Sequence, residues 1–246
     1  MEKQLKLKAY DGKQIECILN TGKKKNSTVV VFVHGLTGSP NEHNYFNAAK
    51  QFPNKGVDTF RFALYEYGPD NRTLADCSIS THGKDIDRVV KYLRPLYKTI
   101  AIVGHSLGCP SILKSDFSLP DVVVLWEPSH LTPARAKRIK TIKLNKQKAF
   151  MREGAFDYLM SEKMIKEWKE FDGTKELPII ESIKKPLLII AAEKGTLVQG
   201  SKAYFKIAQK PKKLVIVKGA THCFDEESTE EVLLTETLKW IKEYSK

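Results

Sequence analysis

The chain has 246 residues, of which 41% are hydrophobic and 9% aromatic, a composition typical of a folded protein with a sizeable core. Its net charge of +12 comes from 41 Lys and Arg residues against 29 Asp and Glu residues. Because no nucleic-acid recognition motif accompanies this charge, we interpret it as a lysine-rich solvated surface and expect no nucleic-acid partner. No apolar run approaches the roughly 20 residues of a membrane span, so we also expect no stable membrane insertion.

Cysteine usage and the first residues of the sequence favour a cytoplasmic protein. Cys17, Cys77, Cys109 and Cys223 are widely spaced and form no C-x-x-C pair, so neither a zinc site nor a disulfide framework is indicated. The first eight residues alternate polar and apolar side chains, which is typical of a strand and not of a signal peptide. We therefore expect a cytoplasmic location and no bound metal.

Strands and helices are predicted in alternation along most of the chain. Lys3–Tyr10 and Lys13–Asn20 flank Asp11-Gly12, a strong hairpin signal. Apolar runs predict further strands, and apolar residues at helical spacing predict helices. The strands are Ser27–Val33, Val57–Leu64, Thr99–Val103, Asp121–Trp126, Pro186–Ala192 and Lys213–Val217, and the helices are Asn44–Phe52, His82–Leu96, Gly200–Ala208 and Ser228–Tyr244. This alternation implies a mostly parallel sheet of about eight strands with helices on both faces.

Residues 104–108 read Gly-His-Ser-Leu-Gly and fall between the strand Thr99–Val103 and the start of a helix. This is the G-x-S-x-G pattern of a nucleophile elbow, in which a serine sits on a strained strand-to-helix turn. Side chains in place of the two glycines would clash with the strand or the helix. Ser106 is therefore our candidate nucleophile.

A serine hydroxyl needs an imidazole to accept its proton, and the imidazole needs an acid to fix its tautomer. His34, Ser106, Glu127, Glu193 and His222 all follow the carboxyl ends of predicted strands, the edge where an open α/β sheet binds ligands. His222 lies between the last strand and the last helix, so the order serine, acid, histidine matches the order that accompanies the elbow. We predict His222 as the base and interpret His34 as structural.

These motifs, from His34-Gly35-Leu36-Thr37-Gly38 through the elbow to Gly219-Ala220-Thr221-His222, resemble those of the α/β-hydrolases of the serine esterase and lipase type. The resemblance covers nearly the whole chain. It implies an α/β-hydrolase fold and an oxyanion hole formed by the backbone N–H groups of Leu36 and Leu107.

One departure from the family pattern concerns the acid. Members typically carry Gly-x-x-Asp-x-x-Val where residues 192–198 here read Ala-Glu-Lys-Gly-Thr-Leu-Val, so Gly195 stands in the place of the aspartate. We predict Glu127 as the acid, because Trp126-Glu127-Pro128 resembles the strand-end acid of pancreatic-type lipases and a buried, unpaired glutamate would be costly. Glu193 is the alternative acid, and Asp225 or no acid at all are further alternatives.

The alternation of strands and helices breaks over 129–183. We expect a core of 1–128 and 184–246 and an inserted cap of 129–183, with a hairpin over Ile139–Phe150 and a helix over Ala155–Phe171. This pattern resembles the caps of cinnamoyl and feruloyl esterases and of monoacylglycerol-lipase-like enzymes. Residues 135–152 hold eight basic side chains and no acidic one. We interpret them as a solvated face, with attraction of anionic substrates or lipid surfaces as the alternative.

The sequence thus predicts a carboxylic ester hydrolase that works through an acyl-enzyme on Ser106, with His222 as base, Glu127 as acid, a small-molecule ester as substrate and no cofactor or metal. The alternative is a catalytically weak protein of the same fold that binds a small ligand or a protein partner, because the acid is missing at position 195. The acyl and alcohol groups, the choice among ester, thioester and amide, and the oligomeric state stay open.

Overall fold

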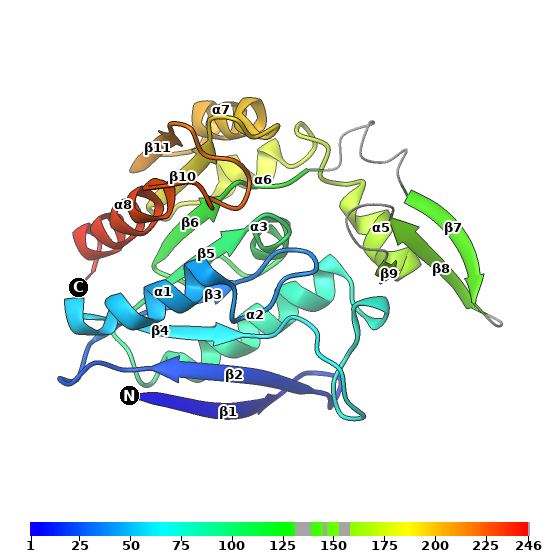
Figure 1. Cartoon of the computed structure of the whole chain (residues 1–246), viewed down its shortest axis with the longest axis horizontal. Coiled ribbons are helices and arrows are strands. Elements are labelled where there is room, and N and C mark those ends of the chain that lie inside the picture. Colours follow the sequence, from blue (N-terminus) through cyan, green and yellow to red (C-terminus); the bar gives the residue numbers. More distant parts are fainter. Residues whose placement is uncertain (131–138, 145–146, 153–157, 246) are drawn as a thin grey trace.

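The central sheet has eight strands within the part of the chain that the structure describes, in the order β1-β2-β4-β3-β5-β6-β10-β11 (Figure 1). Strands β1 and β2 form a hairpin, β2 pairs antiparallel with β4, and every other neighbouring pair in the sheet is parallel. The bounds are β1 (Glu2–Lys8), β2 (Gln14–Asn20), β3 (Thr28–Val33), β4 (Val57–Phe62), β5 (Thr99–His105), β6 (Val122–Trp126), β10 (Leu187–Ala192) and β11 (Lys212–Val217). The mostly parallel sheet predicted from the sequence is confirmed.

The computed structural model describes residues 1–130, 139–144, 147–152 and 158–245, with side chains for all of these except 141–144 and 147–152. In the described residues, no helix is long and apolar enough to cross a membrane.

Alternate side chains of the central strands enter two separate cores. Val29, Val31 and Val33 of β3 pack into one core, whereas Val30 and Phe32 of the same strand pack into the other. Successive side chains of a strand point to opposite faces of a sheet, so a strand without polar residues needs cover on both sides. This is why the apolar runs of the sequence become the middle of the sheet.

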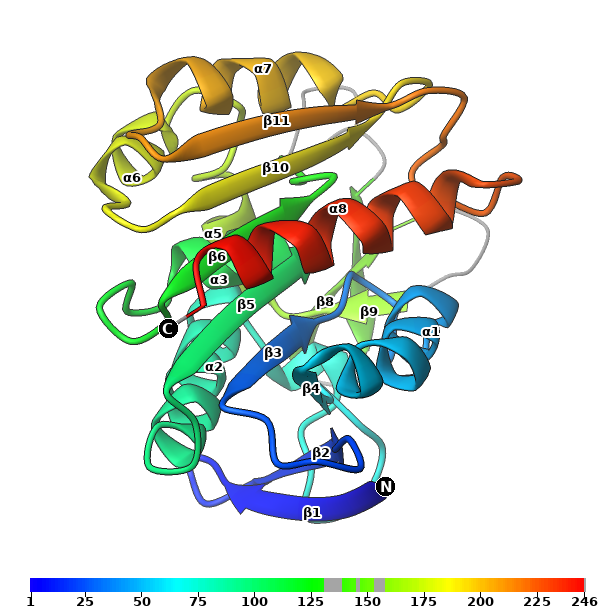
Figure 2. The same cartoon turned by 90° about the vertical axis from the view of Figure 1, so that its left-hand side faces the viewer.

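Helices cover both faces of the sheet, as predicted (Figure 2). The helices α1 (His43–Gln51) and α8 (Thr229–Glu243) contribute to one core. The opposite core receives side chains from α2 (Ile79–Leu93), α3 (Gly108–Leu113) and α7 (Val198–Ile207). Two short 3-10 helices lie in the connections: η1 (Pro53–Lys55) follows α1, and η2 (Leu74–Asp76) precedes α2.

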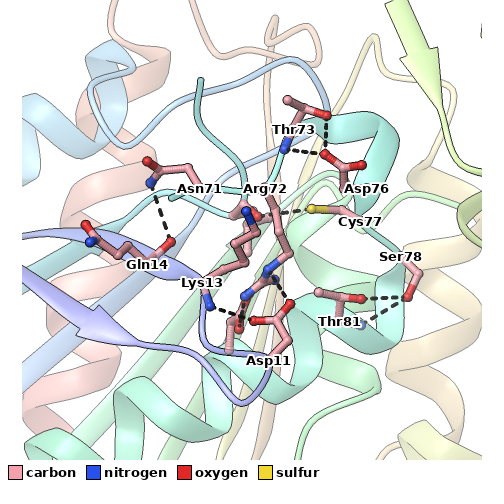
Figure 3. Close-up of polar contacts among 12 residues, drawn as sticks. Asp11, Lys13, Gln14, Asn71, Arg72, Thr73, Asp76, Cys77, Ser78 and Thr81 are labelled. Atoms are coloured by element: carbon pink, nitrogen blue, oxygen red, sulfur yellow. Dashed lines mark hydrogen bonds and ion pairs between the residues drawn. The ribbon is translucent and has the colours of Figure 1, made fainter. Parts of the chain in front are cut away.

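The N-terminus of α2 is held by a polar cluster, drawn in Figure 3. Ser78 is the N-cap and accepts a hydrogen bond from the N–H of Thr81 (3.1 Å). Just before it, Arg72 pairs with Asp11 of the first hairpin (3.1 Å) and with the buried Asp85 of α2 (2.6 Å). Because a serine N-cap satisfies free N–H groups of the first turn, α2 begins at Ile79, earlier than the apolar spacing alone predicts.

Between β6 and β10, the described part of the chain forms a separate three-stranded sheet and two short helices (Figure 1). The predicted hairpin over Ile139–Phe150 is present as β7 (Ile139–Leu144) and β8 (Gln147–Arg152). The predicted helix over Ala155–Phe171 is wrong in its first part, because Tyr158–Met160 forms β9 against β8 and α5 covers only Glu162–Trp168. Residues 153–157 lie outside the described residues. A second helix, α6 (Leu177–Ser182), was not predicted.

A residue at the turn after β9 explains where α5 begins. The side chain of Ser161 accepts a hydrogen bond from the N–H of Met164 and so caps the helix. The same hydroxyl donates to the carbonyl of Cys77 (2.5 Å), and Glu167 of α5 accepts from the N–H of Ser80 in the first turn of α2 (2.7 Å). Met160, Met164 and Trp168 are buried in the core on this face. The inserted segment is therefore packed onto the N-terminus of α2.

Candidate active site

Ser106 lies on the turn between β5 and α3 with a left-handed backbone (φ 52°). Such a conformation costs on the order of 1–3 kcal/mol for a residue other than glycine. The turn leaves no room for a side chain at Gly104 or Gly108, the glycines two residues before and after the serine. A Cβ atom on Gly104 would lie 2.8 Å from the carbonyl oxygen of Gly108, and one on Gly108 would overlap the carbonyl oxygen of Val33. The elbow predicted from the sequence thus has its expected geometry and leaves the Ser106 side chain partly exposed.

The structure brings the three predicted catalytic residues together in one chain of hydrogen bonds. Nε2 of His222 lies 2.9 Å from Oγ of Ser106, and Nδ1 of His222 lies 3.1 Å from Oε2 of Glu127. A carboxylate facing Nδ1 holds the proton there and leaves the lone pair of Nε2 free to accept the serine proton. The arrangement can therefore activate Ser106 as a nucleophile.

Glu127 follows β6 and is completely buried. Its second carboxylate oxygen, Oε1, accepts a hydrogen bond from the N–H of Ala192 at the end of β10 (2.7 Å), and its own N–H donates to the carbonyl of Ile190 (2.8 Å). An ionised carboxylate is costly to bury unless it is paired and hydrogen-bonded. Both oxygens of Glu127 have such a partner, so the carboxylate is fixed toward His222.

The glycine at position 195 provides the space that the Glu127 carboxylate occupies. A Cβ atom on Gly195 would lie 2.6 Å from Oε2 of Glu127, closer than van der Waals contact allows. The place of the usual aspartate and the place of the Glu127 carboxylate therefore overlap. This overlap explains why a glycine replaces the aspartate that the family pattern has at position 195. A side chain at 195 would displace the Glu127 carboxylate from its present position.

The two other carboxylates considered from the sequence are occupied elsewhere. Glu193 is exposed, and its Oε2 accepts a hydrogen bond from the N–H of Gly219 (2.8 Å). Asp225 is exposed and pairs with Nε2 of His43 on α1 (3.2 Å). Of the three candidate acids, Glu127 is the one that the structure places against the His222 ring.

The predicted oxyanion loop, residues 34–38 after β3, packs directly against the elbow. A Cβ atom on Gly35 would lie 3.3 Å from Cβ of Ser106, so the loop after β3 runs along the serine. Within the described part of the chain, no hydrogen bond is found for the N–H groups of Leu36 and Leu107. Unpaired N–H groups beside a nucleophile are what an oxyanion hole requires, and these two stay available for that role.

Two further histidines near the site are buried and neutral. Burial lowers the pKa of His34 to about 4, although the ring bonds the carbonyl of Gly35 (2.8 Å) and accepts from the N–H of Leu64 (3.0 Å). These bonds connect the loop after β3 to the end of β4, in agreement with a structural role for His34.

Burial, and then the nearby His222, lower the pKa of His105 to about 3. Sequence reasoning assigned no contact to His105, and the structure shows Nε2 of its ring 2.9 Å from the carbonyl oxygen of His222.

Among the described residues, no group of three or more His, Cys, Asp or Glu side chains could hold a metal ion. The basic stretch 135–152 lies largely outside the described side chains, so its interpretation stays a prediction.

Comparisons with known proteins bear on the fold and on part of the site. Residues 23–114 match a family model described as "Putative serine esterase (DUF676)". The match includes the predicted oxyanion loop and the elbow. No curated protein matches the sequence.

Several solved structures resemble the whole chain at low sequence identity. Est1E from Butyrivibrio proteoclasticus with ferulic acid bound has a TM-score of 0.80 and 19% identity, with 98% of each chain covered. The esterase domain of a Rhodothermus marinus protein has a TM-score of 0.77 and 16% identity, with 99% of each chain covered. A dienelactone hydrolase from Anabaena variabilis has a TM-score of 0.71 and 14% identity over 100% of this chain and 99% of that chain. The protein therefore has the α/β-hydrolase fold, which confirms the predicted fold class.

Proposed function

We propose that the protein is a serine hydrolase that cleaves carboxylic esters through an acyl-enzyme on Ser106. The observation that carries this proposal is the hydrogen-bonded series Ser106, His222 and Glu127 at the carboxyl edge of the sheet. The match of residues 23–114 to a serine esterase family model supports the same conclusion.

The reaction follows from the positions of these groups. Oγ of Ser106 adds to the carbonyl carbon of the ester while Nε2 of His222 takes the hydroxyl proton. The negative charge on the carbonyl oxygen is held by the N–H groups of Leu36 and Leu107. Collapse of this intermediate expels the alcohol, which receives the proton from His222. A water molecule then gives a proton to His222 while its oxygen adds to the acyl carbon. Cleavage of the bond between the acyl carbon and Oγ of Ser106 releases the acid, and Oγ takes the proton back from His222. Glu127 stabilises the imidazolium in both halves.

The experiment compares the wild type with Ser106→Ala and with Ser115→Ala, a serine that follows α3. A fluorophosphonate probe should label the wild type and Ser115→Ala but not Ser106→Ala. Hydrolysis of p-nitrophenyl acetate and butyrate should fall at least about 1,000-fold in Ser106→Ala alone. Full hydrolysis by Ser106→Ala would show that the nucleophile is wrong.

A second measurement tests which acyl group the site prefers. Est1E, one of the structurally similar proteins, has been solved with ferulic acid, so methyl ferulate belongs in the substrate panel beside the p-nitrophenyl esters. The ratio of kcat/KM values then shows whether the site favours an aromatic acyl group. The weakly catalytic alternative was motivated by the missing acid at position 195. The contact between Glu127 and His222 supports the hydrolase over this alternative, and a wild type that neither labels nor hydrolyses these esters would favour the alternative.

A further inference from the structure

We propose that His105 and Asn44 are positioning residues. They hold the loop of His222 (residues 218–228, the histidine loop) from two sides like a clamp. This inference rests on the proposed function, because it assigns a purpose to contacts around the proposed base. Neither residue touches the reacting atoms in the mechanism above, and both act through the backbone of the histidine loop.

His105 contacts this loop at several points. Its Nε2 lies 2.9 Å from the carbonyl oxygen of His222, and its ring centroid lies 5.0 Å from that of His222 and 6.5 Å from that of Phe224. The ring is buried and neutral, with its pKa lowered to about 3. A neutral imidazole that faces a carbonyl oxygen must carry its proton on the facing nitrogen. His105 therefore donates through Nε2 and adds no positive charge beside the base.

Asn44 holds the next carbonyl of the loop. It lies in the first turn of α1, and its Nδ2 donates to the carbonyl oxygen of Cys223 (3.0 Å). The side chain is 3% exposed, and its Oδ1 has no hydrogen-bond partner within the described part of the chain. An unpaired buried amide oxygen is destabilising compared with an apolar side chain of the same size. The donor bond to the histidine loop gives a reason for an asparagine at this position.

The backbone of the loop needs such support. Phe224 has a left-handed backbone (φ 57°), and its N–H donates to the carbonyl of Thr221 in a tight turn (3.1 Å). Strained backbone persists only where surrounding contacts over-determine it. The bonds from His105 and Asn44 fall on the two consecutive carbonyls just before this strained residue, where they fix the direction of the imidazole.

The clamp also connects the loop of His222 to the elbow and to the first turn of α1. His105 precedes Ser106 in the elbow, and Asn44 follows the oxyanion loop on α1. A displacement of either element therefore changes the distance between His222 and its two hydrogen-bond partners. A misplacement of about 1 Å at a reacting group can cost about 100-fold in rate.

The first test separates positioning from general stability. His105→Asn shortens the side chain so that its amide cannot reach the His222 carbonyl, whereas the amide nitrogen of His105→Gln can occupy the place of Nε2. We expect kcat for p-nitrophenyl butyrate to fall about 10- to 100-fold in His105→Asn, with KM within threefold of the wild type, and His105→Gln to recover most of the loss.

Asn44→Leu removes the second bond and keeps the size of the side chain, and it should show the same fall in kcat with little change in KM. Asn47→Leu is the matched control. Asn47 lies on the same helix, but its amide contacts Glu230 on α8 and not the histidine loop. This control should lose thermal stability at most and keep its kcat.

The second test does not need activity. Amide hydrogen exchange of the peptide 219–228 should be faster in His105→Asn and Asn44→Leu than in the wild type, and unchanged in Asn47→Leu. Unchanged exchange in both variants, together with kcat within threefold of the wild type, would overturn the clamp. Failure of the proposed function would look different, because the wild type itself would then neither hydrolyse esters nor label at Ser106.

Discussion

Gly195→Ala is the substitution whose effect follows most directly from the structure. The added methyl group would lie 2.6 Å from Oε2 of Glu127 and 3.1 Å from the carbonyl oxygen of Ala192. An ordinary contact begins at 3.4 Å, so the carboxylate has to withdraw by about 0.8 Å. The Ala192 carbonyl is part of the backbone, which leaves the Glu127 side chain as the group that moves.

The withdrawal acts on the hydrogen bond between Glu127 and His222. That bond is 3.1 Å long, close to the upper end of the usual range, so a further retreat breaks it. A misplaced catalytic group costs about 100-fold in rate, equivalent to about 2.7 kcal/mol in activation free energy. We expect kcat to fall by this factor and KM to stay within threefold, because the methyl group affects the acid and not the bound ester.

The assay is steady-state hydrolysis of p-nitrophenyl butyrate, with the unfolding temperature measured in parallel. Gly56→Ala is the control. Gly56 has a left-handed backbone (φ 94°), so an alanine there is strained, but no atom lies within 4 Å of the added methyl group. Gly56→Ala should lose stability and keep its kcat. A Gly195→Ala enzyme with kcat within threefold of the wild type would refute the explanation of why glycine stands at this position.

Three further predictions concern the acid and the buried His82. Glu127→Gln keeps the shape of the side chain and removes its charge, so kcat should fall about 1,000- to 10,000-fold. The kcat of Glu193→Gln should stay within twofold of the wild type. The opposite result would make Glu193 the acid. The double variant Glu127→Gly with Gly195→Asp places a carboxylate in the position typical of the family, and its kcat should exceed that of Glu127→Gly at least tenfold; equal rates would show that the two positions are not interchangeable. His82 is buried, which lowers its pKa to about 3 from an unfolded value of 6.5. The unfolded chain therefore takes up a proton below pH 6.5 that the folded protein refuses until about pH 3. Stability is full above pH 6.5 and falls between these limits by about 1.4 kcal/mol for each pH unit. Urea unfolding at pH 6 and 5 should show a shallower decline in His82→Gln than in the wild type, and equal slopes would contradict a neutral buried His82.

Much of the fold could be predicted because its signals are local. An uninterrupted apolar run such as Val29–Val33 needs cover on both faces. Asp11-Gly12 joins two strands without help from the rest of the chain. The inserted segment was harder to predict because spacing alone does not separate a short strand from the first turns of a helix. Met160 pairs with β8 and also belongs to the apolar pattern that continues into α5, and the Ser161 cap decides between the two.

The sequence by itself determined the position of the elbow, the proposed base and the edge of the sheet where they meet, because each depends on residue types next to the end of a strand. The sequence also favoured Glu127 as the acid but left Glu193, Asp225 or no acid as alternatives, and the tertiary structure distinguishes among them. Glu127 and Gly195 are far apart in the sequence, and only the parallel pairing of β6 with β10 brings the carboxylate into the space that the glycine leaves open. The same holds for Asn44, because its contact with the loop of His222 joins the first helix to the last loop of the fold. Volume and hydrogen bonding between distant segments depend on packing in three dimensions, and residue types in a linear pattern do not specify them.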